Sequence, residues 1–372
     1  MSVEEAPPIP AWDCLPLPQW AQIVHEALAA VAQDGYKAVL RQAVVLLTVS
    51  QHVAAAAHCV PLSLDLTPAP EADLLLLPPL LTRLPLRALH LAPRHAGGAE
   101  ALLRCRLVEA ASAASLRRLA ATVACTDTLQ RFPALAELHL HAGVLERLYP
   151  AVLHGLPSLR ALGLHNYQEV ALAALPPSVA ATLHRLEVTP RPGAMCCQLE
   201  VQLPAGARLA SLTVNGSFHS VLSSAAAPQV FIDTAALAQQ CQRACIEAQE
   251  AVWLLPAACA GQEAEAALAS ALLEAGATWH RLELRLLEGA CVELPPAVGR
   301  GGEPPARHAR LDLQRLGQVL KHLSHGVVSA SLRREVCSIF HPWILTLEHT
   351  ARGRAAGTGA SWGGDAGGRH LL

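Results

Sequence analysis

Apolar residues recur along the chain in a short motif, Leu-x-x-Leu-x-(Leu/Val), in which the residues between the apolar positions vary. The alternation at the end of the motif is typical of a strand that buries one face. A weaker version, Leu116-x-x-Leu119-x-Ala121, lies between the first two copies, and a short alternating run begins at Leu62. The six clear copies begin at Leu86, Leu135, Leu159, Leu183, Leu209 and Trp279.

The spacing of the copies indicates a repeated unit. The last position of the motif advances by 24 residues from Leu140 to Leu164, by 24 to Val188 and by 26 to Val214. This interval is typical of a unit made of one strand and a returning helix or turn. Because one such unit cannot bury its leucines alone, neighbouring units must stack, and we expect an α/β solenoid over residues 61–294.

The long interval after Val214 predicts that this array is interrupted or degenerate there. The next clear copy ends at Leu284, which is 70 residues later. Within the gap, the sequence predicts helices at 235–251 and 262–275 and one more strand at 252–255.

Residues 12–60 have the period of helices rather than of strands. From Trp20 onward, apolar residues fall at the spacing of one helix face as far as Val31, and Gly35 ends this first helix. A second helix follows, and Pro61 ends the unit.

The remaining segments have compositions that predict their state. Residues 1–11 are acidic and Pro-rich and residues 351–372 contain seven glycines, so both are expected to be disordered. Residues 295–310 are rich in Gly, Pro and Arg and predict a linker. Residues 311–350 are expected to form a helical C-terminal cap.

Composition narrows the class of protein. Hydrophobic residues make up 52% of the 372-residue chain but aromatic residues only 3%, so the core must consist of Leu, Ala and Val. The formal net charge of −2 gives no basic excess for nucleic acid, and no apolar run of about eighteen residues predicts a membrane span. Eleven scattered cysteines and the acidic, Pro-rich start indicate reduced thiols and a cytoplasmic or nuclear location.

The residues between the motif leucines should form an exposed row, because successive side chains of a strand point to opposite faces. This mixed polar row is the predicted partner-binding surface, and the alternative is a solvated sheet face without a ligand. The last copy of the motif extends it with Arg281, Glu283 and Arg285. The central part of the row comprises Glu137, His139, His141, His165, Arg185, Glu187, Ser211, Thr213 and Asn215.

No motif in the chain predicts catalysis. The sequence has neither a Gly-x-x-x-x-Gly-Lys-Ser/Thr phosphate loop nor a Gly-x-Ser-x-Gly nucleophile elbow. His141 and His165 are one repeat apart and should lie about 5 Å from each other on adjacent strands. Thr189 in the following strand is not a usual zinc ligand, so we expect no metal, no cofactor and no enzymatic activity.

The strand motifs resemble those of leucine-rich repeats of the intracellular type with a helical return, over roughly residues 62–290. That family usually places Asn or Cys three residues after the last strand leucine. Those places here hold other residues, while Asn166 and Asn215 lie out of register. The resemblance therefore implies an irregular array. The five positions are Arg94, Gly143, Tyr167, Arg191 and Ser217.

The N-terminal unit resembles an F-box over roughly residues 15–58, although His52-Val53 stands where that family usually has Trp. The resemblance implies a substrate-recruiting subunit of a Skp–cullin–F-box ubiquitin ligase that acts as a monomer within a complex. The alternative is a plain helical cap on a free-standing repeat scaffold, which would bind proteins without a link to ubiquitin. The positions expected to contact the Skp adaptor or to form the F-box core are Leu15, Pro16, Ile23, Leu28, Leu47 and Val49.

Overall fold

A computed structural model describes most of the chain between Leu15 and His349. The structure describes residues 15–91, 98–122, 128–142, 150–167, 169–190, 198–215, 229–248, 250–259, 262–276, 281–286, 290–294, 307–323, 328–334 and 343–349. The predicted disordered segments at 1–11 and 351–372 lie outside these ranges, as do Arg94, Gly143, Arg191 and Ser217.

Three helices form the N-terminal unit: α1 (Leu17–Val31), α2 (Tyr36–Val49) and α3 (Gln51–Cys59). A short 3-10 turn (Ala32–Asp34) follows α1, and Gly35 then adopts a φ of 88°, a left-handed conformation that glycine tolerates at the start of α2. The sequence predicted one helix after Gly35, but Ser50 divides it. Ser50 is extended, and its hydroxyl accepts a hydrogen bond from the Val53 N–H, which begins α3.

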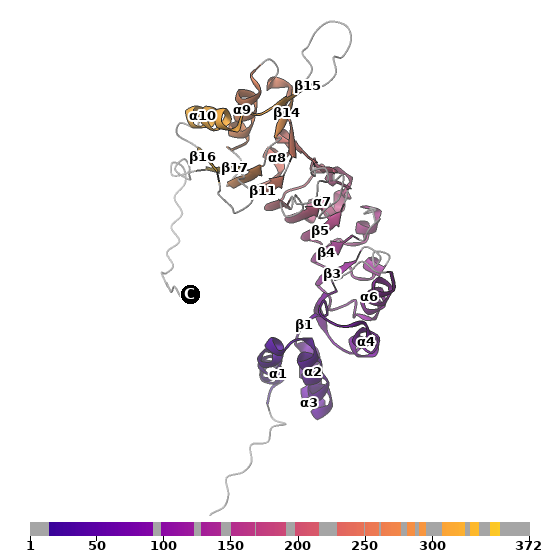
Figure 1. Ribbon diagram of the computed structural model, residues 1–372. Coiled ribbons are helices and arrows are strands. Elements are labelled where there is room, and N and C mark those ends of the chain that lie inside the picture. The colour runs from indigo at the N-terminus through magenta and orange to yellow at the C-terminus, as the bar shows by residue number, and fades with distance from the viewer. Residues whose placement is uncertain are drawn as a thin grey trace, which may run out of the picture.

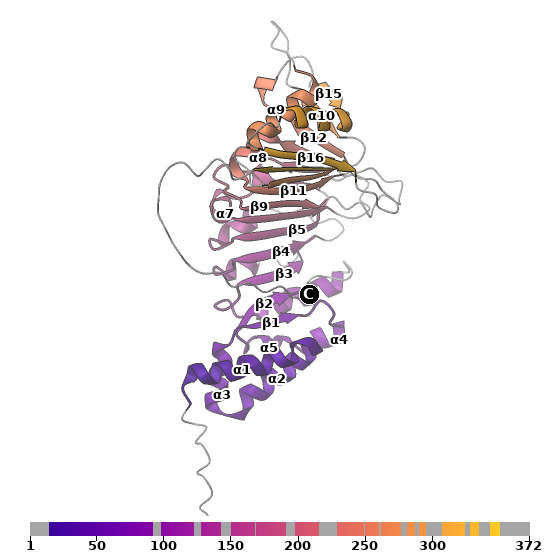
Figure 2. The same ribbon diagram turned by 90° about the vertical axis from the view of Figure 1, so that its left-hand side faces the viewer.

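A large, mostly parallel sheet follows and confirms the α/β class. Figure 2 shows its strands stacked in order from the N-terminal helices upward. Their order is β1-β2-β3-β4-β5-β7-β9-β11-β13-β17-β16, and β17 and β16 run antiparallel to their neighbours. The strands are β1 (Leu62–Asp65), β2 (Leu86–His90), β3 (Arg118–Thr122), β4 (Glu137–His141), β5 (Ala161–Tyr167), β7 (Arg185–Pro190), β9 (Ser211–Asn215), β11 (Arg243–Ala248), β13 (Arg281–Leu286), β17 (Trp343–His349) and β16 (Val328–Arg334).

The motif leucines set the register of this sheet. Leu138 pairs with Leu119 on one side and with Leu162 on the other, and Leu186 pairs with both Leu162 and Leu212. These side chains are buried and form a continuous ladder within one hydrophobic core, which also includes residues of the N-terminal helices. A slip of one residue would turn every leucine toward solvent, so the motif fixes the pairing.

A second sheet packs behind the C-terminal half of the first. Between β5 and β13, the chain alternates between the two sheets, so each pass contributes one strand to each. This differs from the helical return that the resemblance implied. The second sheet has the order β15-β14-β12-β10-β8-β6, formed by β15 (Arg307–Arg310), β14 (Cys291–Leu294), β12 (Glu250–Leu254), β10 (Gln229–Asp233), β8 (Gln198–Val201) and β6 (Glu169–Ala171).

Short helices complete the passes between strands. Figure 1 shows an arc, with α4 and α6 on its outer side and the large sheet lining its inner side. The exposed face of the large sheet is therefore concave and open. These helices are α4 (Glu71–Leu74), α5 (Pro78–Leu81), α6 (Gly98–Ala110), η4 (Pro150–Gly155), η5 (Leu172–Ala174), α7 (Pro177–Thr182), α8 (Thr234–Gln240), η7 (Ala257–Cys259), α9 (Ala264–Gly276) and α10 (Leu313–Leu323).

Between Val214 and Leu284 the array is degenerate, as one of the two predicted alternatives had it, and the large sheet is not interrupted. Strand β11 joins β9 to β13, and its motif is Cys241-x-x-Ala244-x-Ile246, whose three apolar side chains are buried. The predicted helix at 235–251 is correct only as far as Gln240, because β11 and β12 begin within the rest of it. The predictions at 262–275 and 252–255 correspond to α9 and β12.

The C-terminal predictions also need correction. Part of the predicted linker at 295–310 is β15, which pairs antiparallel with β14. In the predicted helical cap at 311–350, only α10 is a long helix, and β16 and β17 extend the large sheet. Alternation explains the difference, because Leu345 and Leu347 pair with Leu284 and Leu282 and add buried side chains to the end of the leucine ladder.

Candidate binding face

The exposed face of the large sheet carries the polar row predicted from the motif. In β4, Leu138 and Leu140 are buried, whereas Glu137, His139 and His141 are half-buried on the opposite face. The same alternation places Glu187 and Thr213 on this face in β7 and β9. The packed leucines thus hold the backbone, and the polar side chains stand on a rigid surface.

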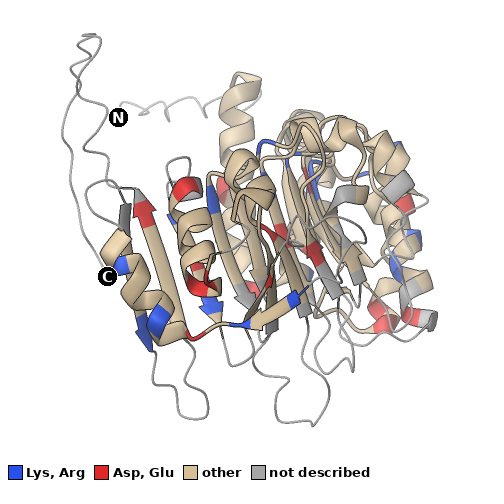
Figure 3. Cartoon of the chain, turned by 90° about the horizontal axis from the view of Figure 1, so that it is seen from above, with Lys and Arg blue, Asp and Glu red and all other residues tan. Residues whose placement is uncertain are grey.

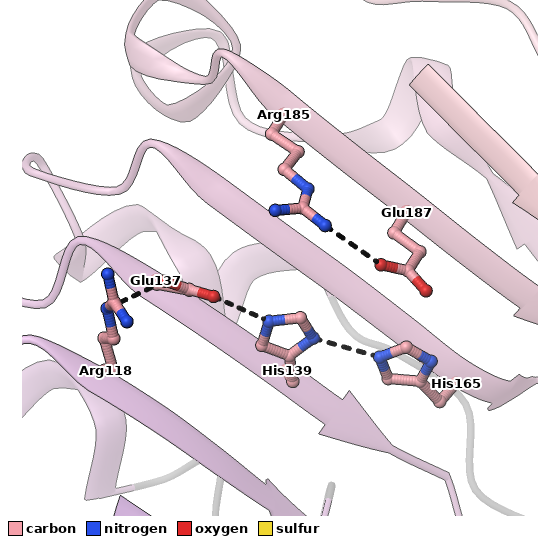
Figure 4. A network of polar contacts seen from close by, with 6 residues as sticks. All are labelled: Arg118, Glu137, His139, His165, Arg185 and Glu187. Carbon is pink, nitrogen blue, oxygen red and sulfur yellow. Dashed lines mark hydrogen bonds and ion pairs between the residues drawn. The ribbon is translucent and has the colours of Figure 1, made fainter. Parts of the chain in front are cut away.

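A connected polar network crosses this face from β3 to β7 (Figure 4). Arg118 Nε lies 3.0 Å from Glu137 Oε2, and Glu137 Oε1 lies 3.1 Å from His139 Nε2. His139 Nδ1 lies 3.1 Å from His165 Nε2, whose ring Nδ1 lies 3.4 Å from the Thr189 hydroxyl. These contacts give a partner to both ring nitrogens of His139 and of His165, and so fix the orientation of the two rings.

Gly163 makes the contact between two of these histidines possible. It is paired with His139 in the register between β4 and β5, and it is buried beneath the two rings. A Cβ on residue 163 would lie 2.2 Å from His139 Nδ1 and 2.7 Å from His165 Nε2. The absence of a side chain here therefore allows His139 to reach across β5.

His141 forms the other side of this histidine cluster. Its ring stacks on His165 with centroids 4.6 Å apart and an interplanar angle of 22°. The sequence predicted this neighbouring pair correctly, but it did not predict that His139 joins it. The signal that could have revealed the third member is Gly163, which occupies an exposed-row position opposite His139.

The environment favours neutral imidazoles at His141 and His165. Burial, together with the nearby His165 and His139, lowers the pKa of His141 to about 4. Burial also lowers the pKa of His165, although the negative charge of Glu187 partly opposes this effect. A neutral imidazole offers one donor and one acceptor, so His141 can form hydrogen bonds with uncharged groups of a ligand.

A second charged group lies further along the face, on β13. Arg281 Nη2 and Arg285 Nε each lie 3.0 Å from a carboxylate oxygen of Glu283. Burial raises the pKa of Glu283, but the hydrogen bonds from Arg285 and Arg281 outweigh it and hold the pKa below its usual range. Charged residues of both signs are interspersed along the ribbon in Figure 3.

The structure brings only some of the predicted face residues into contact. Glu137, His139, His141 and His165 form one cluster, whereas Arg185 lies 3.9 Å from Glu187 in a separate pair. On β9, Ser211 and Thr213 are half-buried, and Asn215 is the last residue of that strand.

The six F-box-like positions are divided between the core and the surface. Leu28 is buried and belongs to the shared core, while Leu15 and Leu47 are half-buried. Pro16 is exposed, Ile23 is 42% exposed and Val49 is 62% exposed, so these three side chains are accessible.

Among the described residues, no group of three or more His, Cys, Asp or Glu side chains is arranged to hold a metal ion. None of the described helices combines the length and apolarity needed to cross a bilayer. No protein-family model matches the sequence, and no curated protein matches it at a significant level.

Proposed function

We propose that this protein is a non-enzymatic scaffold, an irregular leucine-rich-repeat-like solenoid that binds a protein partner on the concave face of its large sheet. The observation that carries the proposal is the open row of half-buried polar side chains that a buried leucine ladder holds in place. A fixed surface of this kind binds with little loss of side-chain freedom.

The size of the face favours a protein as the ligand. Eight spacings between neighbouring parallel strands separate β1 from β13, and strands are spaced about 4.8 Å apart, so this part spans roughly 40 Å. The polar groups are distributed along that length rather than gathered in one cavity. Stable protein interfaces cover surfaces of similar breadth.

A charge placed on the centre of the face provides the test. Thr213→Arg should abolish capture of the partner, because a guanidinium on half-buried β9 blocks close contact. His308→Arg places the same charge on the exposed strand β15 of the second sheet and serves as the matched control. Captured proteins are identified by mass spectrometry and reconstituted with the purified chain, and equal binding by both variants would exclude this face.

We further propose that the N-terminal unit is F-box-like and contacts a Skp adaptor, so that the chain recruits a substrate to a cullin ubiquitin ligase. The support is an accessible apolar surface on α1 and α2, where Ile23, Val45 and Val49 are exposed. Exposed apolar side chains close to one another indicate a protein contact.

The adaptor proposal has a direct test with purified proteins. Val49→Asp should reduce binding to a Skp adaptor at least tenfold, because a carboxylate cannot be buried in an apolar contact without a partner. Leu102→Asp, at an equally exposed position on α6, is the matched control and should bind normally. If the intact chain fails to bind where a known F-box protein binds, the ubiquitin-ligase proposal fails.

A second candidate is a free-standing scaffold in which the helices only cap the sheet. The shared core favours it, since Leu28, Val53 and Ala56 belong to the same hydrophobic cluster as Leu62 and Leu64. Deletion of residues 1–60 distinguishes the F-box-like unit from a plain helical cap. An F-box deletion leaves the sheet folded and abolishes adaptor binding, whereas a cap deletion lowers the thermal stability of the whole chain.

The proposed location is the cytoplasm or the nucleus. Six described cysteines take part in no disulfide bond, which suits a reducing compartment. Fluorescence imaging of the tagged full-length chain tests the location, and secretion into the medium would contradict it.

A further inference from the structure

Two adjoining pockets lie at the amino ends of the first strands, beside the N-terminal helices. The first has a volume of about 480 Å³ and the second about 500 Å³. His58, Pro85 and Ser115 line both pockets, so the two share a wall. These pockets lie along the edge of the sheet, and Glu137 in the lining of the first pocket contacts His139 of the histidine cluster.

Arginines dominate the lining of the first pocket. Arg87, Arg117, Arg118 and Arg160 come from β2, β3 and β5 and the turns that lead into them, and Glu137 of β4 is the acidic residue in the lining. They occupy the variable positions of the Leu-x-x-Leu motif, so the parallel register brings them to the same edge. Four cations and one anion leave an excess of positive charge in this pocket.

Most of these guanidinium groups are available to a ligand. All four side chains are exposed. Arg118 pairs with Glu137, and Arg117 donates to the backbone oxygens of Ala114 and Ala134. Arg87 and Arg160 have no side-chain hydrogen bond or ion pair within the part of the chain that the structure describes. Planar guanidinium groups bind phosphate oxygens in bidentate fashion, which makes this pocket suited to a phosphate group.

The second pocket has a different character. Its lining includes the apolar residues Val44, Leu47, Ala54, Leu80 and Leu84, contributed by α2, α3 and the segment around α5. Ser115, on the wall between the pockets, has a buried hydroxyl without a hydrogen-bond partner among the described residues. An apolar pocket beside a cationic one matches a ligand that carries both kinds of group.

We propose that the paired pockets bind an extended protein segment in which a phosphorylated Ser or Thr occupies the arginine pocket and a large aliphatic side chain occupies its neighbour. This proposal deepens the proposed scaffold function and rests on it. The centres of two pockets of this size are roughly 10 Å apart, and an extended chain rises about 3.3 Å per residue with side chains that alternate in direction, so the two side chains should be about two or four residues apart. The apolar pocket favours a peptide over a nucleic acid or a free phosphate ion.

The test uses the purified full-length chain and a peptide array. The array presents degenerate peptides with a fixed Leu two or four residues from a phosphoserine, on either side. Parallel arrays carry Ser in place of phosphoserine, or Ser in place of Leu. Binding should fall at least tenfold when the phosphate is removed and severalfold when Leu is replaced. Equal binding to the phosphorylated and unphosphorylated arrays would overturn the proposal.

A pair of protein variants assigns the binding to this pocket. Arg87→Ala combined with Arg160→Ala should reduce phosphopeptide binding about tenfold for each arginine and remove the preference for phosphate. Arg243→Ala is the control, because Arg243 is an exposed arginine at the adjacent variable position of the motif in β11, outside the pocket. Leu47→Ala should remove the preference for Leu while leaving the preference for phosphate.

Competitors distinguish other sources of phosphate. If inorganic phosphate or a single-stranded RNA oligonucleotide displaces the phosphopeptide at lower concentration than an unlabelled phosphopeptide does, the site is not a peptide site. Thr213→Arg tests the scaffold proposal independently of the pocket, because it alters the sheet face and leaves the pocket intact. If Thr213→Arg abolishes partner binding but the Arg87 and Arg160 substitutions do not change phosphopeptide binding, the pocket proposal is overturned and the scaffold proposal stands.

Discussion

The Tyr36 hydroxyl, at the start of α2, donates a hydrogen bond of 2.5 Å to Asp73 Oδ2 in α4. Lys37 Nζ lies 2.8 Å from the same oxygen. The Asp73 carboxylate of α4 therefore fixes the start of α2. This contact holds the helical unit against the sheet, where it covers the first leucines and forms one wall of the apolar pocket.

This contact should make the attachment of the helical unit depend on pH. Hydrogen bonds from Lys37 and Tyr36 lower the pKa of Asp73, while burial and the hydrogen bond to Asp73 raise the pKa of Tyr36 to about 12. The Asp73 contribution is complete above the ordinary carboxyl pKa and is lost as pH falls through the lowered value. The Tyr36 contribution is complete below pH 10 and is lost as pH rises through about 12.

Thermal unfolding of Asp73→Asn should therefore differ most from the parent chain near neutral pH. The difference in melting temperature is expected to shrink as the pH is lowered toward 2.5. Asp34→Asn, in the exposed turn before α2, is the control and should follow the parent curve. A pH-independent difference for Asp73→Asn would show that its carboxylate charge does not contribute.

Gly163→Ala should disrupt the histidine cluster without changing the fold. The added methyl group would overlap His139 Nδ1 and His165 Nε2, so at least one ring must move, at a cost of about 1–3 kcal/mol in unfolding free energy. Chemical denaturation measures this cost. His139→Ala removes one obstructing ring, so the double variant should regain most of the lost stability. Additive effects of the two substitutions would contradict the overlap.

Stability should fall in mildly acidic solution because of His141. Its pKa is lowered from 6.5 to about 4 in the folded chain, so the unfolded chain binds the proton more readily. The free energy of unfolding is then highest above pH 6.5, falls as the pH drops toward 4, and levels off below it, with a slope of at most about 1.4 kcal/mol per pH unit.

His141→Asn should flatten this part of the stability curve. Denaturant titrations at half-unit pH intervals from 7.5 to about 4 measure the slope. His90→Asn provides the control, because His90 is exposed at the end of β2. The same slope in the His141 variant as in the parent chain would assign the acid sensitivity to other groups.

Asn166 should tolerate glycine but not a β-branched residue. It adopts a φ of 64° where the register shifts between His165 and Tyr167, at the point where the chain leaves β5 for the second sheet. Asn166→Val should cost about 1–2 kcal/mol of unfolding free energy, because its branched Cβ clashes in this conformation. Asn166→Gly should be nearly neutral, and equal losses for both would exclude a conformational cause.

The leucine motif contained enough information to place most of the large sheet. Its alternation determines which side chains are buried, and its parallel register follows from stacking identical positions. Strand β11 escaped prediction because Cys241, Ala244 and Ile246 fill the core without any leucine. The criterion that mattered physically was apolar burial at that spacing, not the identity of the residue.

Apart from β12, the strands of the second sheet were not predicted from local patterns. Its strands are only three to five residues long within the described segments, for example β8 (Gln198–Val201) and β14 (Cys291–Leu294). Runs this short contain one or two alternations, which occur equally in loops. The arginine pocket could not be predicted for another reason. Its lining brings together residues as far apart in the sequence as His58 and Arg160.

The reversal of strand direction at β17 and β16 has a consequence for self-association. A parallel stack that ended at β13 would offer an unpaired edge able to template a strand from another molecule. Instead, β17 runs the opposite way to β13, and the outermost strand β16, antiparallel to β17, ends in the exposed Arg333 and Arg334, while α2 lies against β1 at the other end. Pairing with a strand of another molecule is thereby disfavoured at both ends of the sheet, so the sheet does not extend into head-to-tail fibres.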